Sequence, residues 1–109
     1  MRRVVITGLG IVSCIGNNKE EVLTSLKGQT SGIRYIPEYE EAGFRSHIAG
    51  RPQINPDDHI DRKQRRFMGD SAAYSYIALK EAIADAGLSD DMVSSPRTGL
   101  IAGSGGASS

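Results

Sequence analysis

The chain has too few cysteines for a disulfide framework and no excess charge of either sign. Its 109 residues contain one cysteine, and 13 Lys and Arg residues balance 13 Asp and Glu residues. A net charge of zero gives no global field that would attract nucleic acid or a membrane surface. No apolar run approaches the roughly 20 residues of a membrane helix, and the run after Arg3 is too short and too glycine-broken for a signal peptide. We therefore expect a cytoplasmic protein, either one small domain or a piece of a larger one.

Glycine, by contrast, is plentiful: there are 13, and they gather at the ends of apolar runs. Residues 4–6 form a short β-branched run that leads into Gly8-Leu9-Gly10. This pattern predicts a buried central strand and a glycine-hinged turn. Residues 98–102 predict a second buried strand, which runs into another glycine-rich segment. The two strands are expected to be parallel neighbours in one sheet.

Two helices are predicted between these strands. Residues 18–27 have Asn18 as a cap with Glu21 three positions later, as in a capping box, and Gly28 closes the helix. Residues 69–87 carry a strong helical pattern, with Asp70 expected as the cap and Gly87 as a left-handed end. The apolar positions that recur at spacings of four and three are Ala72, Tyr76, Leu79, Ile83 and Ala86.

The stretch from residue 29 to 60 has weak periodicity and holds three of the four prolines. It is too long for a structureless loop in a compact domain. It is expected to contain single helical turns and short strands, such as residues 46–50. The element order then alternates strands and helices, which indicates an α/β fold.

Gly8-Leu9-Gly10 allows two interpretations. A dinucleotide fingerprint needs a third glycine where Ser13 stands, and it needs a helix that opens at the second glycine. The predicted helix starts some eight residues later, so a structural turn is favoured over a nucleotide site. Cys14 has no nearby base to activate it and is expected to be a small buried residue. His47 and His59 have no further ligand at metal spacing.

The one concentration of charge lies in residues 61–66, where four cations face a single Asp61. The cations are Arg62, Lys63, Arg65 and Arg66, which give a local charge of +4 − 1 = +3. Such a run is usually a solvated helix face, but it could also dock an acidic partner. Phe67-Met68 beside it is expected to anchor it on the core. The glycine-rich residues 103–106 either let backbone approach a ligand or strand, or form a flexible end.

Taken together and in order, these motifs resemble the β-ketoacyl-acyl-carrier-protein synthases, and most closely the type I enzymes. The resemblance covers nearly the whole chain. The segments that carry it are residues 4–13, Gly16-Asn17, Ser31-Gly32-Ile33, residues 60–63, Arg66-Phe67-Met68, residues 82–88 and residues 99–106.

The resemblance implies a thiolase-like α/β fold, with residues 1–109 as the N-terminal part of its first half, without an internal boundary. It implies a mixed sheet with flanking helices. The implied enzyme is a homodimer that catalyses decarboxylative Claisen condensation between an acyl-enzyme and malonyl-acyl-carrier protein. No metal or bound cofactor is implied, since substrates ride on the phosphopantetheine arm of the carrier.

The resemblance also implies residue roles. Carrier docking falls on Arg62, Lys63 and Arg66, with Arg45 as a further candidate beside them, and Gly106 borders the acyl pocket. The catalytic cysteine and two histidines of the family lie in later sequence, and none of Cys14, His47 or His59 matches them. Two rivals stay open: a nucleotide-binding α/β domain, and a stand-alone interaction module that folds by itself.

Overall fold

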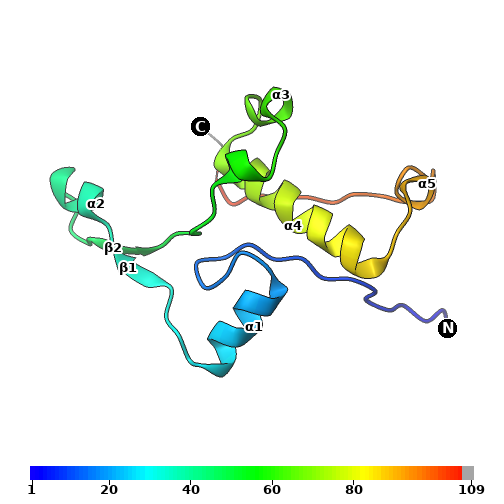
Figure 1. Cartoon of the computed structure of the whole chain (residues 1–109), viewed down its shortest axis with the longest axis horizontal. Coiled ribbons are helices and arrows are strands. Elements are labelled where there is room, and N and C mark those ends of the chain that lie inside the picture. Colours follow the sequence, from blue (N-terminus) through cyan, green and yellow to red (C-terminus); the bar gives the residue numbers. More distant parts are fainter. Residues whose placement is uncertain (107–109) are drawn as a thin grey trace. The chain divides into compact units, whose positions relative to one another are not determined.

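The computed structural model describes residues 1–106, which divide into two compact units. The hairpin unit is Ile11–Ile54, and the helical unit joins Met1–Gly10 to the segment that begins at Asn55. Figure 1 shows the elements of both units along the chain. The prediction that residues 1–109 belong to one incomplete domain stays a prediction. No helix within residues 1–106 is long and apolar enough to cross a membrane.

The hairpin unit begins with helix α1 (Lys19–Lys27), whose capping follows the sequence closely. The Asn18 side chain accepts a hydrogen bond from the backbone N–H of Glu21 at 2.9 Å. The Glu21 carboxylate in turn accepts from the N–H of Asn17 at 2.7 Å, one residue earlier than in the usual capping box. At the other end, Gly28 keeps a right-handed conformation and Gln29 takes the left-handed one, with a φ of 53°.

The rest of the hairpin unit is a two-stranded antiparallel sheet interrupted by a short helix. Strand β1 (Ile33–Tyr35) pairs with β2 (Ile48–Gly50) in a register that places Arg34 opposite Ala49. Helix α2 (Pro37–Glu41) lies between them in the chain. The Tyr35 hydroxyl donates to the Glu40 carboxylate, and this bond raises the pKa of Tyr35 above its usual value. The predicted strand in residues 46–50 is confirmed.

Cys14 occupies a tight, half-buried place in the hairpin unit. A Cβ added to Gly32 would lie 2.8 Å from its sulfur, and one added to Gly50 would lie 2.9 Å from it. Both separations are shorter than real contacts allow, so the two glycines make room for the thiol. Cys14 thus packs closely between the two glycines, but it is half-buried and not buried as predicted.

The helical unit contains four helices, of which one is long. They are the 3-10 helix η1 (Pro56–Asp58), α3 (Arg62–Arg65), α4 (Asp70–Ala86) and α5 (Asp90–Val93). Gly87 ends α4 in the left-handed conformation with a φ of 67°, as predicted. The predicted cap is wrong, because Gly69 is the N-cap and makes no side-chain bond. Asp70 is the first helical residue, and its carboxylate contacts Arg65 instead.

Residues 7–10 run along α4 at very short range. A Cβ on Gly10 would lie 1.8 Å from the carbonyl oxygen of Ala78, and one on Gly8 would lie 2.4 Å from that of Ala82. Two residues of extended chain advance about 6.6 Å, and four helical residues advance about 6.0 Å. The glycines therefore meet successive turns of α4 in matched steps, running antiparallel to it. The N–H of Leu9 also donates to Asp85 at 3.0 Å.

The two predicted parallel strands are wrong for this structure, because neither residues 4–6 nor residues 98–102 form a strand. The only sheet within residues 1–106 is antiparallel β1–β2, so the expected mixed sheet is absent there. A strand is held by hydrogen bonds to neighbouring strands, and within residues 1–106 these segments have no such neighbour. Val4 is accordingly 93% exposed and Ile101 fully exposed.

The apolar core is correspondingly small. Within the described part of the chain, the buried apolar side chains are Val22, Ile36, Pro56, Ile60 and Ala73. Helix α1 is buried only at Val22, since Leu23 and Leu26 are more than half exposed. In α4 Ala73 is the one fully buried residue, and most of the other apolar residues are partly covered. Leu79 is the exposed large apolar side chain of this helix, at 38%.

Candidate functional site

The candidate site is the basic cluster, defined as Arg62, Lys63, Arg65 and Arg66, on and just after α3. Two short caps build this region. The Asn55 side chain accepts from the N–H of Asp57 at 3.1 Å and starts η1. The Asp61 carboxylate accepts from the N–H of Lys63 at 2.8 Å and starts α3. The cluster therefore begins at a position that the aspartate before it fixes.

Three cations of the cluster face solvent. Arg62, Lys63 and Arg66 are exposed, and within residues 1–106 none of them forms an ion pair. The Arg66 guanidinium lies over the Phe67 ring, 4.6 Å from its centroid. Phe67 itself is 79% exposed, so the expectation that it anchors the cluster on the core is wrong. The buried apolar residues in this region are Pro56 and Ile60.

A shallow hollow lies beside the exposed cations. Its volume is about 330 Å³, and its lining residues are Asp57, Ile60, Arg62, Arg65 and Arg66. Three of its five lining residues are cations and one, Ile60, is apolar, which suits contact with an acidic protein surface. Because these exposed cations have no carboxylate partner among residues 1–106, an acidic ligand would not have to displace one there.

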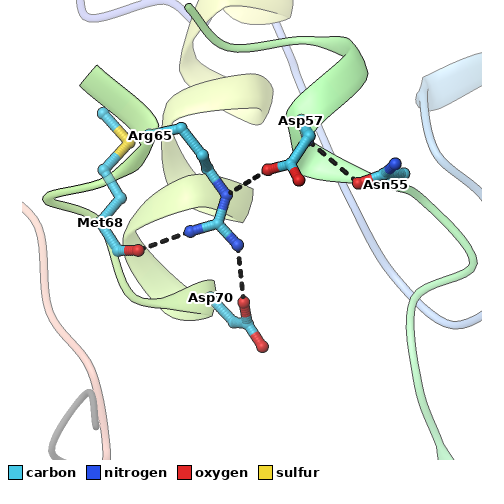
Figure 2. Close-up of polar contacts among 5 residues, drawn as sticks. All are labelled: Asn55, Asp57, Arg65, Met68 and Asp70. Carbon is cyan, nitrogen blue, oxygen red and sulfur yellow. Dashed lines mark hydrogen bonds and ion pairs between the residues drawn. The ribbon is translucent and has the colours of Figure 1, made fainter. Parts of the chain in front are cut away.

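Arg65 differs from its neighbours, and sequence reasoning assigned it no role of its own. Figure 2 shows its side chain turned inward between Asp57 and Asp70. Its Nη1 donates to the carbonyl of Met68 at 2.5 Å, and its Nη2 donates to Asp70 at 3.2 Å. Its buried Nε lies 3.0 Å from the Asp57 carboxylate, close enough for an ion pair but not aligned as a hydrogen bond. The sequence signal that could have identified this role is the pair of aspartates around Arg65: Asp57, eight residues before it, and Asp70, five residues after it.

Two other predicted site residues are placed as follows. Arg45 is exposed in the hairpin unit, and its part in the same surface stays a prediction. Gly106 is the last described residue and helps to line a hollow of about 310 Å³. The other lining residues are Ser71, Ala72 and Ser75 of α4, with Ala102, Gly103 and Ser104. A Cβ on Gly106 would meet nothing within 4 Å, so this wall is open.

The remaining candidates show no catalytic arrangement. His47 Nε2 contacts the carbonyl of Phe44 at 2.8 Å, as an ordinary hydrogen-bonded histidine does. Within residues 1–106, no group of three or more His, Cys, Asp or Glu side chains could hold a metal ion. Gly8 and Gly10 pack on α4, and α1 begins only at Lys19. This geometry favours the structural interpretation of the glycines over a nucleotide site.

Known proteins match this chain along nearly its whole length. The family described as "Beta-ketoacyl synthase, N-terminal domain" matches residues 1–109. The 3-oxoacyl-[acyl-carrier-protein] synthase 1 of Haemophilus influenzae is 62% identical over 105 residues, covering 96% of this chain and 26% of that protein. The Escherichia coli protein of the same name is 52% identical over 109 residues, covering 99% and 27%.

A solved structure agrees with the sequence relatives. The crystal structure of a beta-ketoacyl synthase from Burkholderia phymatum matches with a TM-score of 0.66 and 34% identity. The match covers 84% of this chain and 23% of that one, so the chain spans about a quarter of the length of its relatives. This likeness confirms the predicted thiolase-like α/β class. The chain belongs to the β-ketoacyl synthase family and carries sequence of its N-terminal domain.

Proposed function

We propose that the chain is part of a type I 3-oxoacyl-acyl-carrier-protein synthase that elongates fatty acids. The printed names and high identity of the relatives support this activity. In the proposed reaction, malonyl-acyl-carrier protein loses CO₂, and its enolate attacks the thioester carbonyl of an acyl-enzyme. The enzyme thiolate leaves, and a carbon–carbon bond forms. The segment contributes no catalytic residue to this step, because the implied cysteine and two histidines lie in later sequence.

The contribution of this segment is a docking surface for acyl carrier protein. The observation that carries it is the set of three exposed cations without ion-pair partners, Arg62, Lys63 and Arg66, with Arg45 as a possible fourth. Acyl carrier proteins are acidic, so the contact is largely Coulombic. Charges of this kind act mainly on the association rate, and salt screens them.

The segment also supplies a wall of the acyl pocket at Gly106, where the hollow beside α4 leaves space for a chain. The complete enzyme is a cytoplasmic homodimer in this proposal. It needs no metal or bound cofactor, because the phosphopantetheine arm of the carrier delivers both substrates.

A chimera tests the proposal directly. Residues 1–109 replace the matching segment of the Escherichia coli relative, to which they are 52% identical. The chimera should catalyse condensation with acyl carrier protein as substrate. Lys63→Glu combined with Arg66→Glu should raise the carrier KM roughly ten- to thirtyfold at low salt, because two attractive contacts become repulsive. The effect should shrink at high salt.

The matched control is Lys80→Glu with Arg97→Glu, which makes the same charge change at two exposed positions outside the cluster. Its carrier KM should change much less than that of the Lys63 and Arg66 variant when both are compared at about 0.1 M salt, where charges more than about 10 Å apart are largely screened. A folded chimera without condensation would refute the activity. An unchanged KM in the Lys63 and Arg66 variant would show that the cluster is only a solvated face.

A further inference from the structure

Helix α3 has no apolar side chain of its own in the core, and the nearest buried apolar residue is Ile60 before its cap. The helix is four residues long and contains no buried residue. Isolated helices shorter than about 12 residues are marginal in water. A helix of four residues therefore depends on contacts with its surroundings. Phe67, which follows it, is 79% exposed and gives no anchor. The weak contact between the Tyr76 hydroxyl and Gln64, at 3.4 Å, adds little.

Arg65 supplies the missing contacts. Its three nitrogens reach three separate places in the helical unit: Asp57 in η1, the carbonyl of Met68 in the connecting segment, and Asp70 at the start of α4 (Figure 2). The Arg65 side chain is 23% exposed, in contrast to the exposed cations around it. The planar, forked guanidinium can make such divergent contacts, and the single ammonium of lysine cannot.

The charges divide into two groups with different roles. Asp57 and Asp70 face the Arg65 guanidinium, so Arg65 presents no free cation to a partner. The charges of Arg62, Lys63 and Arg66 remain available to a partner. Removing a carboxylate from this region makes it more positive, which by charge alone should strengthen binding of an acidic carrier.

We propose that Arg65 is a positioning residue for carrier docking, which fixes α3 so that Arg62, Lys63 and Arg66 present together to the carrier. This inference rests on the docking surface proposed above. Arg65 does not touch the carrier in this arrangement. It acts through the orientation of its neighbours.

Two variants of the active chimera separate positioning from charge. Arg65→Lys keeps the charge and loses the three-way contact, and should raise the carrier KM about three- to tenfold. Asp57→Asn removes one anchor and adds positive charge, and should still raise the carrier KM about two- to fivefold. The matched control is Asp58→Asn, an exposed neighbour with the same charge change and no contact with Arg65. Its KM should stay level or fall.

Rates with a small pantetheine thioester, which does not use the docking surface, should change much less than the carrier KM in Arg65→Lys and Asp57→Asn. This readout separates positioning from a general loss of structure. Should Arg65→Lys melt early or lose the small-substrate rate, Asp57→Asn decides the question. The inference would be overturned if the carrier KM of Asp57→Asn stayed level or fell, as that of Asp58→Asn should. An unchanged carrier KM in a folded Arg65→Lys would overturn it as well. Failure of the parent chimera to use the carrier would instead refute the docking proposal itself.

Discussion

Alanine at Gly10 should destabilise the protein through a collision with the backbone of α4. The added Cβ would lie 1.8 Å from the Ala78 carbonyl oxygen, about 1.6 Å inside the 3.4 Å at which ordinary contact begins. At Gly8 the Cβ would lie 2.4 Å from the Ala82 oxygen, which is about 1.0 Å inside. Neither glycine has a positive φ, so the penalty is steric and not conformational.

The magnitude follows from the nature of the neighbours. Overpacking typically costs about 1–3 kcal/mol, and a helix carbonyl cannot rotate away as a flexible side chain can. We expect Gly10→Ala near the upper end of that range and Gly8→Ala near the lower end. Replacing glycine also restricts the unfolded chain, which returns about 0.4–1 kcal/mol. The matched control is Gly99→Ala, where the Cβ meets nothing within 4 Å, so only this favourable term acts.

The assay is the apparent melting temperature of each variant in the chimera. It should rise in the order Gly10→Ala, Gly8→Ala, parent, Gly99→Ala. Adding Ala78→Gly to Gly10→Ala should not restore stability, because the colliding atom belongs to the backbone. Equal melting of Gly10→Ala and Gly99→Ala would refute the packing argument. Rescue by Ala78→Gly would show that side chains, not the carbonyl, set the contact.

Two further predictions concern the pocket wall and the isolated chain. Gly106→Ile in the chimera should slow acyl transfer from long acyl chains roughly ten- to hundredfold more than from short ones, by overpacking the pocket side; equal slowing at every chain length, measured as transfer rate over a series, would return Gly106 to a plain turn residue. The 109-residue chain alone should lack a sharp, reversible urea transition, because Val4, Ile6 and Ile101 are at least 91% exposed; a cooperative monomer transition would favour the stand-alone module.

Local signals in the sequence predicted local structure well. Asn18 and Glu21 set the start of α1, and Gly87 set the end of α4, because caps depend on residues within one turn. The basic cluster was visible for the same reason, since its charges are contiguous. The family could be recognised from the order of its motifs along the chain.

Features that depend on distant partners were not predictable in this way. The strand in residues 4–6 was inferred from β-branched residues, but a strand also needs neighbours, which residues 1–106 do not supply. The sequence predicts a turn at Gly8 and Gly10. The structure shows that glycine is required there because α4, some 70 residues later, leaves no room for a side chain. Arg65 cannot be told from its cationic neighbours in the sequence, because its role depends on Asp57 and Asp70, which the fold brings to either side of it.

The extended segment at residues 4–6 has a consequence for how this chain behaves before it is fully assembled. Its apolar side chains are exposed, and within residues 1–106 its backbone pairs with no strand. An open apolar edge of this kind is a template for pairing with other chains, and so for aggregation. Arg2 and Arg3 stand directly before it, where charges act as gatekeepers against such pairing. Charged residues at the start of an apolar run therefore lower the tendency of residues 4–6 to pair with other chains.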